Sequence, residues 1–288
     1  LLYERCLVTC AHYDEFWQRY ARWMAGQPGK EEEVRNIYQR ASCLYVPIAN
    51  PATRLQYAYF EEMSGRVDVA KEIHDAILIN LPNHVETIVS LANMSRRHGG
   101  LEAAIEVYKS QLDSPQSDLA TKAALVAEWA RLLWKIKGSP EDARQVFQTN
   151  QQYYMDSRPF WTSYLNFELD QPTSSSTENV QYERIKQVIE DIRSKSTLPA
   201  DVVRELVQIY MVYLLERGTK DAAKEYMTLD REVHGPASVS KMKAAEAVQL
   251  PPAQPVPSAT PVAEVVVPTP PQANPYAYYQ QTPVNGGM

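Results

Sequence analysis

The chain has 288 residues, and 29 Lys and Arg against 35 Asp and Glu give it a formal net charge of −6. This mildly acidic balance argues against a protein whose main task is to neutralise nucleic-acid phosphates. No apolar run approaches the roughly 18–20 residues of a membrane span, so we expect no membrane contact, and three cysteines exclude a disulfide-stapled scaffold.

Amphipathic segments with helical spacing run from the start of the chain to about Gly235, with almost no alternation of the β type. Asn50-Pro51 and Ser139-Pro140 place a capping side chain before a proline at the first helical position. Asn83, followed by Glu86, resembles a capping box. The glycines at which first helices of helical hairpins should stop are Gly65, Gly99, Gly138 and Gly218.

A four-residue pattern recurs in the predicted first helices: an apolar residue, an aromatic three later, then a small residue, and a large residue two further on. The six segments that fit it, with deviations, are Trp17/Tyr20/Ala21/Trp23, Arg54/Tyr57/Ala58/Phe60, Ile88/Leu91/Ala92/Met94, Val126/Trp129/Ala130/Leu132, Trp161/Tyr164/Leu165/Phe167 and Val207/Tyr210/Met211/Tyr213. Each predicted second helix carries an anchor residue, and these are Tyr3, Tyr38, His74, Tyr108, Phe147, Ile189 and Met227. Their spacing of 34 to 42 residues predicts an all-α, tetratricopeptide-like solenoid.

The first anchor lies in a second helix that has no first helix before it, so we expect further repeats to precede residue 1. We therefore predict a solenoid of about six helix pairs over residues 1–235, with the first pair incomplete. Residues 236–288 differ in composition from the rest of the chain, because eleven of the twenty prolines lie after Gly235. Such a segment is expected to be mostly disordered or polyproline II, with a possible short helix at 238–250. Its run Tyr276-Ala277-Tyr278-Tyr279 is either a docking segment for a proline-reading domain or part of a passive tail.

The repeats resemble the half-a-TPR (HAT) type that occurs mostly in RNA-processing proteins. The resemblance rests on Trp17, Tyr20, Ala21 and Trp23, on residues 57–61, and on the second-helix run 34–41. Residues 3–7, 13–17 and 96–102 resemble the pre-mRNA-processing factor 39 family more closely, and this likeness extends to about residue 235. A Ser- and Thr-rich insertion at 172–179 departs from the family pattern.

The resemblance implies a nuclear, non-catalytic scaffold without cofactor or metal, associated with proteins of the U1 snRNP and supporting 5′ splice-site recognition. It also implies a dimer, with itself or with a paralogous HAT protein, through the last repeats. The helix around Tyr210 is apolar nearly all round, so either a second chain or a capping helix at 238–250 should cover it. The candidate interface residues are Val207, Tyr210, Met211, Tyr213 and Leu214.

Two other functions stay open: a HAT scaffold of another RNA-processing complex such as 3′-end cleavage, and a direct RNA-binding protein. Weak candidates for RNA or partner contacts are the basic residues Arg96, Arg97, Arg131, Lys135 and Lys137. We favour a solvated charged face for them, with RNA met mainly indirectly, because acidic residues are interleaved throughout. Glu61 and Glu168 fall at equivalent repeat positions, which favours a repeated structural role over acid–base catalysis. Cys6 and Cys10 are better explained as packing residues than as metal ligands.

Overall fold

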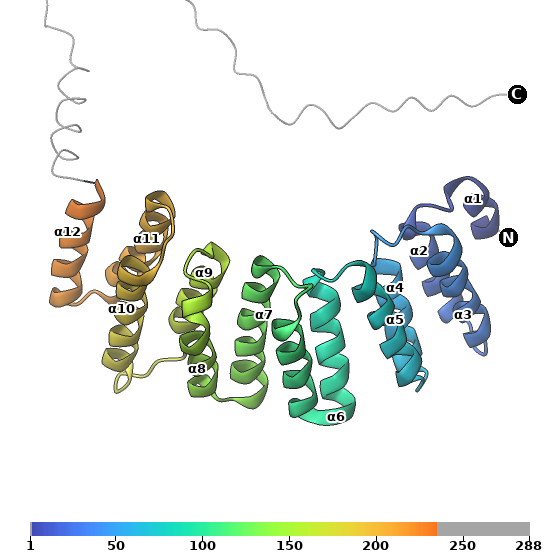
Figure 1. Cartoon of the computed structure of the whole chain (residues 1–288), viewed down its shortest axis with the longest axis horizontal. Helices are drawn as coiled ribbons and strands as arrows, with labels where there is room; N and C mark the ends of the chain where they lie inside the picture. The colour runs from blue at the N-terminus through green and yellow to red at the C-terminus, as the bar shows by residue number, and fades with distance from the viewer. Residues whose placement is uncertain (1, 235–288) are drawn as a thin grey trace, which may run out of the picture. The chain divides into compact units, whose positions relative to one another are not determined.

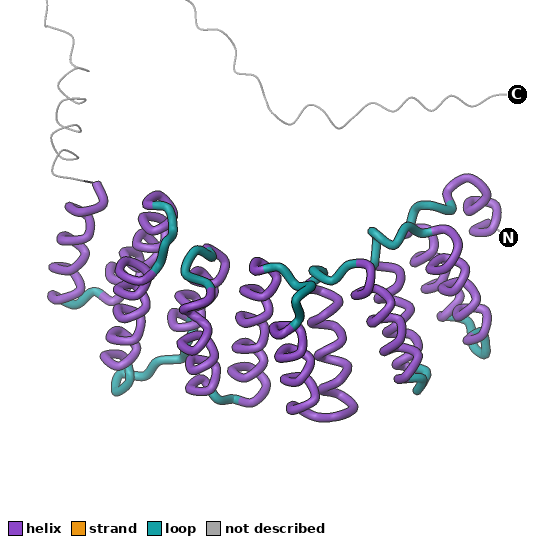
Figure 2. The backbone as a smooth tube through the Cα atoms, in the orientation of Figure 1, coloured by secondary structure: helices purple, strands orange, loops and turns teal. Residues whose placement is uncertain are grey.

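The computed structural model describes residues 2–234 (Figure 1, Figure 2). Residue 1 and residues 235–288, which hold the predicted tail and the possible helix at 238–250, lie outside the described residues. The described part has helices as its regular elements: α1 (Leu2–Cys10), α2 (Asp14–Ala25), α3 (Glu31–Arg40), α4 (Ala52–Met63), α5 (Val67–Asn80), α6 (Val85–Asp113), α7 (Leu119–Leu132), α8 (Pro140–Asn150), α9 (Arg158–Leu169), α10 (Glu178–Lys195), α11 (Ala200–Arg217) and α12 (Lys220–His234).

These helices form hairpins that lie side by side in chain order, each packed against its neighbours (Figure 1). Helix α1 comes first, and the pairs α2–α3, α4–α5, the two halves of α6, α7–α8, α9–α10 and α11–α12 follow it. Helix α6 is broken at Gly100, whose backbone has φ +83° and ψ −176°. We predicted this break at Gly99, one residue too early; the residue in the left-handed region is Gly100. The predicted all-α solenoid is confirmed for the described residues.

Small residues let the two helices of a hairpin approach, as their spacing predicted. The side chains of Ala21, Ala58, Ala92 and Ala130 are at most 1% exposed. The apolar core consists of two clusters, and consecutive residues of α4 belong to different ones: Tyr57 to the cluster built from α1–α4, and Ala58 to the cluster that continues to α12. Trp23 deviates from the pattern, since 51% of its side chain is exposed.

The register of the last second helix is one residue off the prediction. Met227, the predicted anchor, is 63% exposed, whereas Ala222 is buried and Tyr226 is half-buried against the core. In the other hairpins the first buried apolar residue of the second helix and the anchor are four residues apart, as in Ala143 and Phe147. Ala222 and Tyr226 keep that spacing, so Tyr226 is the anchor of α12.

The caps agree with the prediction at Ser139 and differ at Asn50 and Asn83. Helix α4 has Pro51 itself at the N-cap position and no side-chain capping hydrogen bond. Ser139 Oγ accepts a hydrogen bond from the backbone N–H of Asp142 and caps α8. Asn83 does not cap α6: the ring of His84 does, by accepting from the N–H of Thr87. Asn83 Oδ1 instead accepts from the N–H of Asp118 at 2.8 Å, which ties the start of α6 to the start of α7.

Candidate functional site

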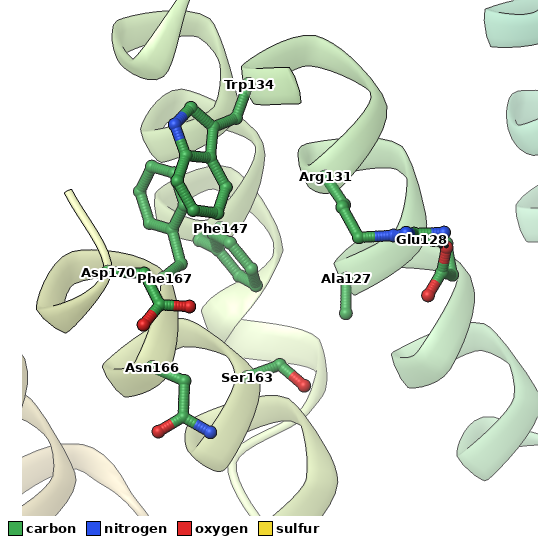
Figure 3. A pocket seen from close by; sticks show the side chains of 9 residues that line it. All are labelled: Ala127, Glu128, Arg131, Trp134, Phe147, Ser163, Asn166, Phe167 and Asp170. Carbon is green, nitrogen blue, oxygen red and sulfur yellow. Dashed lines mark hydrogen bonds and ion pairs between the residues drawn. The ribbon is translucent and has the colours of Figure 1, made fainter. Parts of the chain in front are cut away.

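A groove between the first helices of two neighbouring hairpins, α7 and α9, offers a candidate binding site (Figure 3). Aromatic side chains form its floor: Phe147 and Phe167 are buried, and Trp134 is half-buried. The Trp134 and Phe167 rings meet edge to face, with centroids 5.5 Å apart. The walls of this α7–α9 groove are Ala127, Glu128 and Arg131 on one side and Ser163, Asn166 and Asp170 on the other.

A π-helical turn, η2 (Leu133–Lys137), extends α7. Leu133, three residues after the buried Ala130, lies in the core. Trp134 lies three residues after Arg131 and seven after Ala127, on the same face of the helix, and meets Phe167 at the groove (Figure 3). The turn ends at Gly138, whose φ of +73° suits glycine.

The two walls differ in charge. Arg131 donates two hydrogen bonds to Glu128 Oε2, from Nη2 at 2.6 Å and from Nε at 2.9 Å, so the α7 wall is neutral. Asp170 is exposed at the C-terminal end of α9 and forms no ion pair with any described residue. The lining includes no His or Cys, and its two acids are Glu128, which is paired with Arg131, and Asp170. Aromatic rings beside a side-chain amide and a hydroxyl suit the binding of an extended peptide.

A buried ion pair, here called the Arg–Glu clasp, lies beneath the α7–α9 groove and joins α8 to α9. Arg144 donates from Nε and Nη2 to the two carboxylate oxygens of Glu168 at 2.5 and 2.8 Å, and the Glu168 side chain is fully buried. The same clasp joins α3 to α4, where Arg35 donates to Glu61 at 2.8 and 3.2 Å. The predicted structural role of Glu61 and Glu168, repeated between hairpins, is confirmed by this geometry.

In each clasp the arginine also lies near an aromatic ring and donates a hydrogen bond to a second carboxylate. The guanidinium of Arg144 lies 5.7 Å from the centroid of Phe167, and that of Arg35 lies 5.6 Å from Phe60. Burial disfavours the charge of Arg144, but its hydrogen bonds to Glu168 and to Glu141 outweigh this and raise its pKa above the usual range. The hydrogen bond to Glu61 likewise raises the pKa of Arg35. Both arginines therefore stay charged, and both buried carboxylates are neutralised in place.

Comparison with known proteins gives these repeats a family. The family model for the PRP39 C-terminal HAT repeat matches residues 1–97. Pre-mRNA-processing factor 39 of Schizosaccharomyces pombe is 41% identical over 242 residues, which is 83% of this chain and 40% of the relative. This chain belongs to the pre-mRNA-processing factor 39 family. The resemblance inferred from the repeat residues is confirmed.

More distant relatives cover less of the chain. Pre-mRNA-processing factor 39 of Homo sapiens is 27% identical over 187 residues, 62% of this chain and 26% of the relative. Cleavage stimulation factor subunit 77 of Arabidopsis thaliana is 27% identical over 217 residues, 73% of this chain and 27% of the relative. The chain thus spans no more than about two fifths of the length of these curated relatives.

The structure places the candidate dimer residues, which were chosen for the apolar character of their helix, inside the chain's own core. Helices α10 and α12 both pack against α11, which explains why that helix is apolar nearly all round. Val207, Tyr210, Met211 and Leu214 are buried, and Tyr213 is half-buried. Tyr210 Oη also donates to Glu225 of α12 at 2.9 Å. The dimer stays a prediction, but a partner on α11–α12 would meet other apolar residues, namely Val212, Leu215 and Met227, which are 56%, 58% and 63% exposed.

The structure does not gather the five basic candidates into one patch. Arg96 and Arg97 end the first half of α6, Arg131 lies on α7, and Lys135 and Lys137 lie on η2. Three of them are neutralised within the chain, and Lys135 Nζ lies 3.4 Å from the centroid of the Trp134 ring. The ion pairs are Arg97–Glu62, Arg131–Glu128 and Lys137–Asp142, at 2.7, 2.6 and 2.6 Å.

Six groove residues were missed from the sequence: Ala127, Glu128, Trp134, Ser163, Asn166 and Asp170. Asn166 could have been found from the sequence, because it occupies the repeat position that Arg131 holds in the preceding hairpin. Asn166 is exposed on α9. Trp134 could have been found as well, because it lies three residues after Arg131 and seven after Ala127, on the same helical face. Within residues 2–234 no cluster of His, Cys, Asp and Glu could hold a metal ion, and no helix is long and apolar enough to cross a membrane. Cys6 and Cys10 are half-buried.

Proposed function

We propose that this chain is a non-catalytic scaffold in pre-mRNA splicing. It associates with proteins of the U1 snRNP in the nucleus and supports 5′ splice-site recognition by holding protein subunits. The names of the relatives support a role in mRNA processing. The observation that carries the proposal is the α7–α9 groove, whose aromatic floor and polar walls fit an extended segment of a partner protein.

The charges of the array favour protein over RNA as the direct partner. Arginines that face a neighbouring hairpin are paired with its carboxylates: Arg40 with Glu4, Arg97 with Glu62, and Arg184 with Glu141. A phosphate would have to displace these acids, and each exchange gains little because one anion replaces another. The net charge of −6 points the same way.

One observation supports a second candidate, a scaffold in 3′-end cleavage of mRNA. Cleavage stimulation factor subunit 77 of Arabidopsis thaliana matches 73% of this chain, though at 27% identity. The identity to the Schizosaccharomyces pombe factor is higher, at 41% over 83% of the chain, and we therefore rank splicing first.

Affinity purification of the tagged full chain from nuclear extract separates these functions. The splicing scaffold predicts recovery of U1 RNA together with U1 proteins, whereas recovery of cleavage factors instead would favour the second candidate. RNA retained by the purified chain alone, with a steep dependence on salt, would contradict a purely protein-binding role.

Matched variants test whether the α7–α9 groove is the contact. Ser163→Trp fills the groove from the α9 wall and should reduce capture of the protein partners at least tenfold. Ser175→Trp adds the same indole to an exposed loop position and should leave capture unchanged. Equal capture by both variants would place the contact elsewhere on the array.

We further propose that the chain dimerises, with itself or with a paralogous HAT protein, through the exposed residues of its last hairpin. Light scattering on the full chain should give twice the monomer mass at micromolar concentration if the chain pairs with itself. A Val212→Asp, Leu215→Asp variant should then return the monomer mass. A monomeric unmodified chain would leave pairing with a paralogue as the surviving form of this proposal.

A further inference from the structure

The α7–α9 groove carries one negative charge that no described residue balances. Its charged lining residues are Glu128, Arg131 and Asp170, and the first two are paired with each other. Asp170 remains, at the C-cap position of α9, where the helix dipole adds further negative potential. The groove therefore favours a ligand that brings a cation rather than an anion.

Asp170 lies beside the aromatic floor of the groove (Figure 3). It follows Phe167 by three residues, so the two side chains are neighbours on α9, and the ring of Phe167 meets that of Trp134 with centroids 5.5 Å apart. Arg131 points toward its own acid and away from Asp170 (Figure 3). Lys135 Nζ lies over the Trp134 ring, but Lys135 does not line the groove. A carboxylate and aromatic rings thus face the same space, and the two nearby cations are engaged elsewhere.

Elsewhere in the chain the same two components, a carboxylate and an aromatic ring, hold an arginine. In each case two guanidinium nitrogens donate to the two carboxylate oxygens, and the guanidinium carbon lies 5.2 to 5.7 Å from a ring centroid. The three sets are Arg144 with Glu168 and Phe167, Arg35 with Glu61 and Phe60, and Arg40 with Glu4 and Trp17. A planar guanidinium matches this fork, whereas the compact ammonium of lysine does not. The groove supplies a carboxylate and rings, so arginine is the cation that fits it.

We propose that the α7–α9 groove binds an extended segment of a partner protein that carries an arginine, whose guanidinium pairs with Asp170 beside Phe167 and Trp134. This inference rests on the proposed function, because it names the chemistry of the partner segment. Ser163 and Asn166 lie seven and four residues before Asp170 on the same strip of α9, where their hydroxyl and amide can bond the backbone of the segment. An RNA phosphate would meet the carboxylate of Asp170 with like charge, which favours a protein ligand.

A peptide array tests the preference for arginine. Nonapeptides with arginine at the centre and uncharged residues at the other positions are probed with the purified full chain, and the strongest binder is synthesised again with citrulline in place of arginine. Citrulline keeps the shape of the side chain and removes its charge. In fluorescence anisotropy the arginine peptide should bind the unmodified chain about fivefold more tightly than the citrulline peptide, which is the ratio expected for a partly exposed ion pair.

Matched variants assign that preference to Asp170. In Asp170→Asn the difference between the two peptides should disappear, whereas Asp156→Asn, which neutralises an exposed aspartate outside the groove, should keep it. Ser163→Trp should weaken the binding of both peptides, because the indole fills the groove. The proposal is overturned if the arginine and citrulline peptides bind the unmodified chain equally, if the difference persists in Asp170→Asn, or if no peptide of the array binds.

Capture from nuclear extract separates this proposal from the proposed function. Asp170→Asn should recover several-fold less of the protein partners than Asp156→Asn does. Equal recovery of U1 proteins by the two variants would overturn the arginine contact and leave the scaffold function standing. If neither the unmodified chain nor the variants recover U1 proteins, while the preference for the arginine peptide still depends on Asp170, the proposed function fails and the arginine preference of the groove stands.

Discussion

Breaking the Arg–Glu clasp between α8 and α9 should destabilise the array far more than the loss of an exposed ion pair would. In Arg144→Ala, Glu168 keeps a fully buried carboxylate and loses both hydrogen bonds that neutralise it. Removing one partner of a buried pair costs about 3–5 kcal/mol, because the charge that remains is uncompensated. The lost contact of the guanidinium with Phe167 adds to this, by about 0.5–2 kcal/mol for such contacts.

Urea denaturation followed by circular dichroism measures the loss, and hydrogen exchange locates it. Because each hairpin contacts only its neighbours, the variant should open first around α8 and α9 rather than over the whole array. Arg131→Ala is the matched control: it removes an arginine from an ion pair on the same groove, but one whose side chains are 61% and 30% exposed. Such a pair is worth at most about 1 kcal/mol.

Another pair of hairpins in the chain shows how the stability lost in Arg144→Ala can be restored. Between the third and fourth hairpins the positions equivalent to Arg144 and Glu168 hold Ile105 and Leu133, and both are buried in the core. The double variant Arg144→Ile, Glu168→Leu should therefore lie within about 1 kcal/mol of the unmodified chain, or exceed it in stability. The reasoning is refuted if Arg144→Ala costs no more than Arg131→Ala, or if the double variant is as unstable as the single one.

Three further predictions concern single positions. The ring of His74 is buried, with Nδ1 donating to the carbonyl of Ala70 and Nε2 hydrogen-bonded to Ser90, and burial lowers its pKa. The folded array therefore holds the neutral form of His74. The free energy of unfolding should reach its highest value above about pH 6.5 and decrease below that pH, because the unfolded chain binds the proton more readily. His74→Phe, which copies the anchor at Phe147, should make this decrease smaller in denaturation curves measured from pH 5 to 7. Ala58→Leu should cost about 1–3 kcal/mol by overpacking a position with no exposed surface, and an unchanged melting curve would show that the inferred helix approach is incorrect. Gly100→Ala should cost about 1–3 kcal/mol, because φ +83° with ψ −176° is open to glycine and hardly to other residues; a stability equal to that of the unmodified chain would contradict the break in α6.

The sequence sufficed for the architecture because the solenoid repeats the same demand in every unit. Four of the six hairpins place an alanine where their two helices approach, as at Ala58 and Ala130, so the spacing of these alanines marks the hairpins. The equivalence of Glu61 and Glu168 even predicted the clasp positions, although their partners on the preceding helices were not foreseen.

The predicted cap of α6 was wrong because a hydrogen bond to another helix determines which of two neighbouring side chains caps it. Asn83 and His84 both have side chains that can cap α6, and only the contact of Asn83 with Asp118, 35 residues away, settles the choice. The apolar character of α11 was recognised, but a pattern does not distinguish burial by a second chain from burial by α10 and α12.

The seam between the two apolar clusters has a mechanical consequence. Across α4 the core passes from one cluster to the other between Tyr57 and Ala58, with Ile73 of α5 packing against both. From Ala58 onward a single cluster reaches Leu229, so flexing there would pull apart packed apolar surface. The seam therefore lies within α4, between its face toward α3 and its face toward the later hairpins. The clasp of Arg35 and Glu61 and the stacked rings of Tyr38 and Tyr57 join α3 to α4 on one side of it, and they determine how firmly the amino-terminal helices are held to the rest of the array.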